Sequence, residues 1–280
     1  MKLARSLFVK EAILFGAVQG LGLWTAFRFL HDLKLSYLIP SVSTELHLNL
    51  LDVFILAAFI SIFIFLARKR GRISQVFFRL FLWLIVFSGA QIIFSLFLSP
   101  INTAIFSLAV VLAMALIPRV LILNVAVILG LAGLGTVLGL SITPIAAVWI
   151  LAVLSVYDII AVYWTKHMVQ MAEGMIASKA IFGFIIPTHS SGFKEKLSAV
   201  QPGENFMILG SGDVALPLIL VVSVARVSFL QAIIVAGFSI LGLLLTHLIF
   251  INQKERRPMA ALPPIAMLSI VGYLITNLIF

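Results

Sequence analysis

The chain contains no cysteine and has few charged side chains, which make up only 10% of its 280 residues. The absence of cysteine excludes disulfides, thiol nucleophiles and thiolate metal ligands, and it leaves the redox compartment unreadable. A soluble domain of this size carries about a quarter charged residues. Because 62% of the residues are hydrophobic and the mean hydropathy is +1.22, a water-soluble globule would lack the polar surface to cover its core. The composition therefore predicts a protein that folds in a lipid bilayer.

Acidic residues are scarce as well: ten Asp and Glu stand against nineteen Lys and Arg, for a net charge of +9. The basic residues form short clusters between apolar segments, which is typical of a membrane topology signal and not of a phosphate-binding face. We therefore expect no nucleic-acid partner, and the sequence predicts neither a metal nor another cofactor. Nothing before Lys10 resembles a cleaved signal peptide, so the first helix is expected to act as its own insertion signal.

Hydrophobic segments of the length that a helix needs to cross the hydrocarbon core, about 20 residues, recur along the chain. The sequence therefore predicts an all-α, polytopic membrane protein with nine transmembrane helices, and eight is the competing count because the boundaries from the third to the sixth are soft. The predicted helices are Ala12–Leu30, Asn49–Ala67, Phe78–Leu98, Asn102–Pro118, Val120–Leu140, Ile142–Thr165, Asn205–Ala225, Val227–Ile251 and Ala261–Phe280.

The basic residues orient these nine segments. If the N-terminus is cytoplasmic, sixteen Lys and Arg lie on the inside and only three, Arg28, Lys34 and Arg226, lie on the outside, which together account for all 19. A bias this steep predicts orientation, because cytoplasmic loops carry the excess of basic residues. We therefore expect a multi-pass membrane protein with its N-terminus in the cytoplasm.

The chain is expected to form one integrated membrane domain in three parts. Residues 1–165 would form an N-terminal six-helix portion, residues 166–204 a cytoplasmic loop, and residues 205–280 a C-terminal three-helix portion. The loop contains an apolar run, Ala180–Ile186, which ends at Pro187.

Two of the ten acidic residues, Asp158 and Asp213, lie well inside predicted helices, whereas the other eight fall in loops or near membrane interfaces. An acid at the centre of such a helix costs ~2.5–3.5 kcal/mol on insertion scales, so it usually faces a cavity or a partner. Asp158 lies eight residues before Lys166, and Asp213 lies nine residues after Glu204. At 1.5 Å per residue each acid is about 12–14 Å from the cytoplasmic boundary. Two consecutive antiparallel helices therefore present carboxyls at nearly the same depth.

Two close carboxyls in a low-dielectric site cannot both ionise readily, so they share one proton and titrate in two separated steps. This is the chemistry of aspartic proteases, in which one carboxylate activates water and the protonated partner polarises the carbonyl. The same pair suits a proton- or cation-coupled transporter. A non-catalytic scaffold, with both acids protonated and bonded to neighbouring helices, is a third interpretation. The acids alone do not separate the protease from the transporter.

The residues around the two acids narrow these alternatives. Tyr157-Asp158 places an aromatic ring beside the first acid, where it either borders a cleft or packs against lipid. In Gly210-Ser211-Gly212-Asp213, two glycines weaken the helix and let another backbone approach closely. Pro217 removes a donor four residues later, and in lipid the freed backbone is tolerated only beside protein or a water-filled cavity. Pro263 and Pro264 indicate a helix break or a helix start at the last segment.

Together these motifs resemble the GxGD intramembrane aspartyl proteases, the family of presenilins and signal peptide peptidases. Members of that family have nine spans, with Tyr-Asp in the sixth, Gly-x-Gly-Asp in the seventh and Pro-Ala-Leu at the start of the ninth. Tyr157-Asp158 and Gly210-Ser211-Gly212-Asp213 match in the right spans and order. Ala261-Leu262 matches the end of the third motif, and Ala260 stands where that motif has proline.

The resemblance implies a presenilin-like fold and hydrolysis of peptide bonds within transmembrane helices of substrates, which would be single-span membrane proteins or signal peptides. It also implies an archaeal homologue in the cell membrane, in which obligate partner subunits are not expected and a homo-oligomer is allowed. The catalytic residues would be Asp158 and Asp213, and substrate would be positioned by Tyr157, Gly210, Gly212, Ala261, Leu262 and Pro263.

A helical substrate hides its backbone amides, so cleavage requires unwinding, and the exposed strand then needs hydrogen-bond partners. We expect Ala180–Ile186 and Ala261–Pro264 to supply them by strand addition. Because both acids lie nearer the inside, we expect cleavage toward the cytoplasmic end of the substrate helix.

Overall fold

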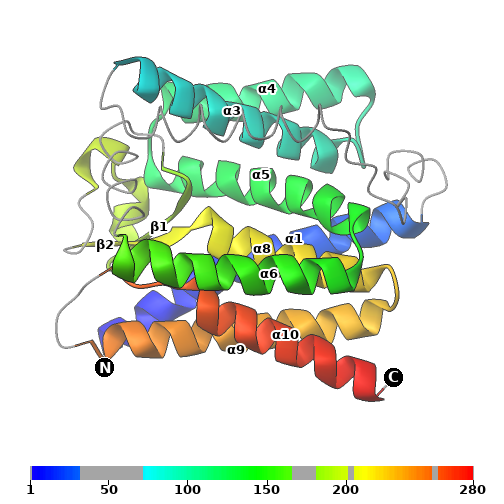
Figure 1. Ribbon diagram of the computed structural model, residues 1–280. Coiled ribbons are helices and arrows are strands. Elements are labelled where there is room, and N and C mark those ends of the chain that lie inside the picture. The colour runs from blue at the N-terminus through cyan, green and yellow to red at the C-terminus, as the bar shows by residue number, and fades with distance from the viewer. Residues whose placement is uncertain (1, 32–71, 166–180, 201–204, 254–257, 280) are drawn as a thin grey trace.

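The structure is a computed structural model that describes residues 2–31, 72–165, 181–200, 205–253 and 258–279. These residues form a bundle of helices that run roughly along one common direction, with a small sheet at one end (Figure 1). The helices are α1 (Lys2–His31), α3 (Arg72–Phe94), α4 (Pro100–Leu116), α5 (Val120–Ser141), α6 (Pro144–Ile159), α8 (Ser211–Ala225), α9 (Phe229–Ile251) and α10 (Leu262–Ile279).

Six of these helices are long and apolar enough to cross a membrane, when the π-helical segment Ile160–Trp164 is counted with α6. The shorter apolar helices are α4 and α8, which have 17 and 15 residues. The second predicted span, Asn49–Ala67, lies outside the described residues, so the count of nine stays a prediction.

A two-stranded antiparallel sheet corrects the prediction that the chain is all-α. Strand β1 (Gly183–Pro187) pairs with β2 (Phe206–Gly210), with Gly183 opposite Gly210. The predicted seventh helix, Asn205–Ala225, is therefore wrong over its first residues, because α8 begins only at Ser211. A short run of apolar residues is compatible with a buried strand and with a buried helix, so hydrophobicity alone does not distinguish the two. After β1 the chain makes two 3₁₀ turns, Ser190–Lys194 and Leu197–Ala199.

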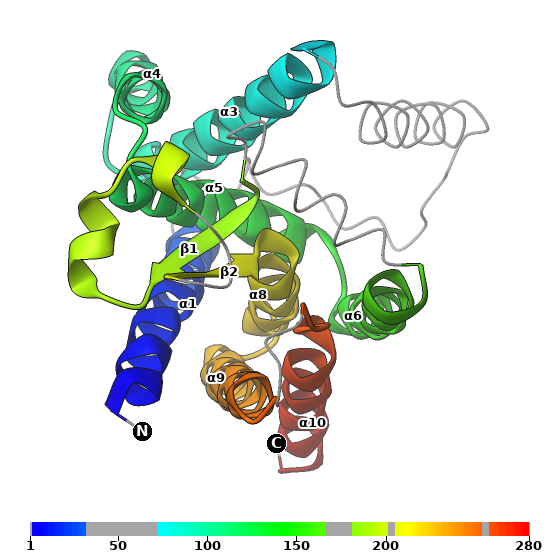
Figure 2. The same cartoon turned by 90° about the vertical axis from the view of Figure 1, so that its left-hand side faces the viewer.

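Helix α5 forms the centre of the bundle and packs against α1, α3 and α8 (Figure 2). Glycines allow its close approach to α3, because a Cβ atom on Gly133 would collide with the carbonyl oxygen of Gly89. Small residues at helix contacts let backbones pack closely in membranes, where apolar burial alone does not drive helices together. On the other side, α9 packs against α10, with a 2.8 Å hydrogen bond between the hydroxyls of Ser239 and Ser269.

The sheet lies at the end of the bundle where α1 begins, and β2 leads directly into α8 (Figures 1 and 2). The ammonium group of Lys10 on α1 donates hydrogen bonds to the carbonyl oxygens of Pro187 (2.9 Å) and Thr188 (2.8 Å). The end of β1 is therefore attached to the first helix.

Candidate active site

Asp158 lies near the end of α6 and is buried, with 5% of its surface exposed. Its Oδ2 atom accepts a hydrogen bond from the backbone N–H of Leu262, at 3.3 Å. Leu262 is the first residue of α10, so its N–H is one of the donors that a helix cannot satisfy internally. A carboxylate at a helix N-terminus is also stabilised by the helix dipole. The start of the last helix therefore holds the Asp158 carboxyl.

Asp213 lies in the first turn of α8, at the third helical position after the N-cap residue Gly210. Its carboxyl lies beside the backbone of Gly210. This is the position from which the acid of a capping box reaches back toward the N-cap N–H. Asp213 was expected in the middle of a helix, and the structure corrects this to a helix N-terminus because the strand extends to Gly210.

Packing explains why glycine occupies the N-cap of α8. A Cβ atom on Gly210 would lie 2.9 Å from Oδ2 of Asp213, closer than side-chain atoms normally approach. Gly212 differs, because a Cβ atom there would meet nothing within 4 Å, and its surface is exposed. The first glycine therefore makes room for the carboxyl, whereas the second leaves open space beside it.

The structure brings the two acids together. Helices α6 and α8 pack against each other, and the carboxyls of Asp158 and Asp213 are close enough to interact electrostatically. Both carboxyls lie at helix N-termini, of α10 and α8, although Asp158 itself belongs to a third helix. Two neighbouring carboxyls from different helices, one of them bonded to a backbone N–H, form a pair of the kind that can share one proton.

The start of α10 is anchored by α9. The hydroxyl of Thr246 donates a hydrogen bond to the carbonyl oxygen of Ala261, at 3.2 Å, directly before Leu262. Ala260 stands where the third motif of the GxGD proteases has proline. It is buried, with 4% of its surface exposed. Pro263 lies in the first helical turn, where its missing N–H costs nothing, so the prolines mark a helix start and not a break.

Tyr157 is exposed over 55% of its surface, whereas its neighbour Asp158, about 100° round the helix, is buried. An exposed tyrosine on an apolar helix fits a side chain that faces lipid or an arriving substrate. Its role in positioning substrate stays a prediction.

Sequence reasoning missed a polar contact that supports α8 near the second acid. The amide of Gln19 on α1 donates to the carbonyl oxygen of Val214 at 3.4 Å, and Gln19 is 2% exposed. Pro217 lies inside α8, which continues through it to Ala225. The sequence signal for this contact was a glutamine inside an apolar helix, because a polar side chain buried there needs a hydrogen-bond partner.

Sequence reasoning also missed a buried acid. Glu11 was placed near a membrane interface, yet it is 0% exposed and its Oε2 lies 2.6 Å from Nδ1 of His247, which is 2% exposed. This pair joins α1 to α9 one residue from Thr246, the residue that holds the start of α10. The two partners lie 236 positions apart in the chain, so no local pattern pointed to their contact.

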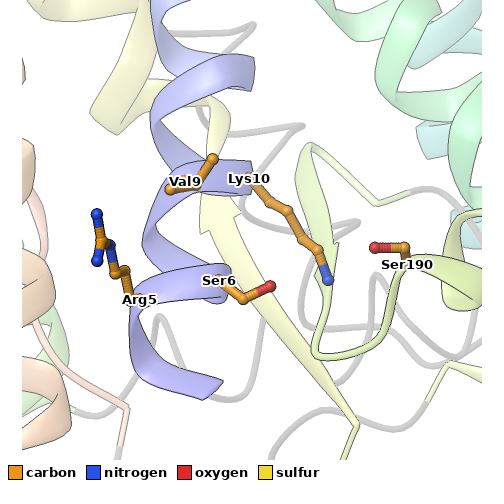
Figure 3. Close-up of a pocket in the computed structure, with 5 residues that line it drawn as sticks. All are labelled: Arg5, Ser6, Val9, Lys10 and Ser190. Atoms are coloured by element: carbon orange, nitrogen blue, oxygen red, sulfur yellow. The ribbon is translucent and has the colours of Figure 1, made fainter. Parts of the chain in front are cut away.

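No group of three or more His, Cys, Asp or Glu in the described part of the chain could hold a metal ion. A surface pocket of about 420 Å³ lies away from the two acids, lined by Arg5, Ser6, Val9, Lys10 and Ser190 (Figure 3). Lys10 points across this pocket toward Ser190 (Figure 3). Its ammonium donates hydrogen bonds to the carbonyl oxygens of Pro187 and Thr188 at the end of β1.

The fold is similar to that of two solved structures described as a presenilin family intramembrane aspartate protease, in different crystal forms. One, in space group P2, has a TM-score of 0.65 at 24% identity and covers 96% of each chain. The other, in space group C222, has a TM-score of 0.59 at 24% identity and covers 95% of each chain. Among curated proteins, none matches this chain.

The sequence profile described as signal-peptide peptidase, presenilin aspartyl protease matches residues 20–280, nearly the whole chain. This match and the apolar helices identify an integral membrane protein and do not favour the transporter interpretation. The chain therefore belongs to the signal-peptide peptidase and presenilin family of aspartyl proteases, and it is an aspartic endopeptidase.

Proposed function

We propose that Asp158 and Asp213 form the catalytic dyad that hydrolyses peptide bonds within transmembrane helices of substrate proteins. The observation that carries the proposal is the arrangement of the two carboxyls. Leu262 N–H binds one carboxyl, the other lies beside the Gly210 backbone, and the two carboxyls are close enough to interact electrostatically. A pair with one shared proton supplies a base and an acid at the same place.

In the proposed reaction, the ionised carboxyl takes a proton from water as the water oxygen attacks the peptide carbonyl carbon. The protonated carboxyl donates its proton to the carbonyl oxygen, giving a tetrahedral intermediate. As that intermediate collapses and the C–N bond breaks, one of its hydroxyls returns its proton to the ionised carboxyl, and the protonated carboxyl passes its proton to the departing nitrogen. The products are a new carboxyl terminus and a new amino terminus, and the dyad again holds one proton.

In this proposal the sheet offers the unwound substrate a strand to pair with, and the hydrogen-bond register favours β2. Ser211 N–H bonds to the Phe182 carbonyl, and Thr188 N–H bonds to the Asn205 carbonyl. In an antiparallel sheet, opposed residues alternate between pairs that hydrogen-bond to each other and pairs that do not. Counting from the two bonded pairs, Ile208 belongs to a pair that does not bond across the sheet. Ile208 therefore directs its N–H and carbonyl away from β1. This outer edge of β2 runs directly toward Asp213.

The expectation that Ala180–Ile186 and Ala261–Pro264 pair with substrate needs correction. In β1, both backbone groups of Ile185 already bond to the side chain of Asn124. In the last segment, Leu262 N–H bonds to Asp158, the Ala261 carbonyl accepts from Thr246, and the prolines have no N–H. We therefore assign strand addition to the outer edge of β2.

The proposed orientation has the N-terminus in the cytoplasm, as the distribution of Lys and Arg indicates. The sheet and the starts of α1 and α8 then lie toward the cytoplasmic side (Figure 1). Cleavage is expected in the cytoplasmic half of the substrate helix.

The function is tested with protein purified in detergent and a single-span reporter substrate, with fragments identified by mass spectrometry. Asp158→Asn and Asp213→Asn should each abolish the fragments that the parent produces. Glu195→Gln, which makes the same acid-to-amide change at an exposed site, is the matched control and should retain activity. Fragments that persist in either aspartate variant would refute the proposed dyad.

The strand assignment is tested by Ile208→Pro, which removes an outward-facing N–H and keeps the pairing with β1. Cleavage should fall sharply while the thermal stability of the protein changes little. Cleavage at the parental rate would show that substrate does not pair with this edge.

A further inference from the structure

Asn124 on α5 makes an unusual contact with the sheet. Its Nδ2 donates to the carbonyl oxygen of Ile185 at 2.8 Å, and its Oδ1 accepts from the N–H of the same residue at 3.0 Å. Both Asn124 and Ile185 are 0% exposed. One side-chain amide therefore satisfies both backbone groups of one strand residue, as a neighbouring strand would.

A second contact holds the same edge of β1 two residues further along the strand, at Pro187. Lys10 donates to the carbonyl oxygens of Pro187 and Thr188, and Pro187 has no N–H to offer. The edge of β1 that faces away from β2 is thus occupied at Ile185 and at Pro187. In the described part of the chain, β2 has the edge to which a further strand can add.

We propose that Asn124 is a positioning residue for peptide hydrolysis, which fixes β1, and through it β2, in register with the dyad before substrate arrives. This inference rests on the proposed function, because it concerns how the substrate strand meets Asp213. Asn124 touches neither acid and acts through the sheet. It also directs substrate to β2 by occupying the competing edge.

The position of Asn124 supports this role over simple packing. A polar amide buried in an apolar helix is costly unless it is bonded, and the backbone of Ile185 is equally costly without a partner. The contact is also directional, because its two hydrogen bonds fix the position of one strand residue, whereas apolar packing would allow the strand to slide. A strand that slips by one residue turns every side chain to the opposite face, so a pinned residue sets the register of the whole sheet.

The anchor is tested first by hydrogen exchange without substrate. In the parent, the Ile185 amide should exchange slowly, and Asn124→Leu should speed its exchange by about tenfold or more. Thr136→Val is the matched control, because it removes a fully buried hydroxyl from the same helix. That hydroxyl bonds to α1 and to α5 itself, and not to the sheet. This variant should leave the Ile185 amide unchanged. Exchange of that amide at the rate of an open loop in the parent would overturn the proposal, even if Asn124→Leu fails to fold.

The positioning role is tested by mapping every cleaved bond in the reporter. Asn124→Leu should raise KM and spread the cleavage over neighbouring bonds, whereas Thr136→Val should keep the parental cleavage sites. Asn124→Gln keeps the amide and should restore the parental sites in part. Parental KM and sites in folded Asn124→Leu would overturn the proposal. If the parent cleaves nothing, the proposed function fails, and the exchange experiment still decides whether Asn124 orders β1.

Discussion

Gly210 provides a sharp test of how the second acid is positioned. A Cβ atom at this residue would lie 2.9 Å from Oδ2 of Asp213, whereas ordinary contacts begin at 3.4 Å, so the carboxyl must move by about 0.5 Å. The displaced atom is the end of a side chain, so the fold can adjust. In catalysis, however, a misplacement of about 1 Å can cost 10²-fold. We expect Gly210→Ala to lower kcat by about tenfold or more.

Stability and activity can be separated at this position. Alanine is a poor N-cap, so Gly210→Ala should also cost ~0.5–1 kcal/mol of stability. Serine is at least as good an N-cap as glycine, yet its Cβ meets the same carboxyl oxygen. Gly210→Ser should therefore keep the parental melting temperature and still lose activity.

The assay measures kcat and KM on the single-span reporter beside thermal unfolding in the same detergent. Gly237→Ala is the control, because this glycine lies on an exposed face of α9 and a Cβ atom there meets nothing within 4 Å. It should match the parent in both measurements. A folded Gly210→Ser variant with kcat within about twofold of the parent would refute the argument that this glycine makes room for the carboxyl.

Three further predictions follow from the dyad, the buried pair and the helix packing. The pH profile of kcat should be bell-shaped, because activity requires one proton on the pair and is lost when both acids are protonated or both ionised; a flat profile would contradict the shared proton. Glu11→Leu should destabilise the protein by ~3–5 kcal/mol, because it breaks the buried contact between Glu11 and Nδ1 of His247, and the double change to leucine should recover much of this loss in a double-mutant cycle. Gly133→Ala should lower the melting temperature clearly, because its Cβ would collide with the backbone of Gly89, whereas Gly16→Ala meets nothing within 4 Å and should not.

Hydropathy and the cost of buried charge carried most of what could be predicted from the sequence. Apolar length located the helices, and the depth of Asp158 and Asp213 singled out two acids that the structure brings together. Apolar composition did not reveal the strand before Ser211, because strand and helix bury the same residues.

The contacts that support the site lay beyond prediction for a different reason. Asn124 and Ile185 are 61 positions apart, and the hydrogen bond from Leu262 to Asp158 spans 104 positions. Local periodicity carries no information on such pairs. A buried polar residue in an apolar helix does signal that a partner exists, and only the fold identifies it.

The central claim, that the two aspartates hydrolyse a peptide bond with water, is tested most directly by cleaving the reporter in oxygen-18-labelled water. The mass of the fragment with the new carboxyl terminus is then measured for the parent, Asp158→Asn and Asp213→Asn. We predict that the parent's fragment gains one oxygen-18 atom and that neither variant yields the fragment. A fragment that either variant still releases with the label would contradict the assignment of the dyad, and an unlabelled fragment from the parent would contradict hydrolysis by water.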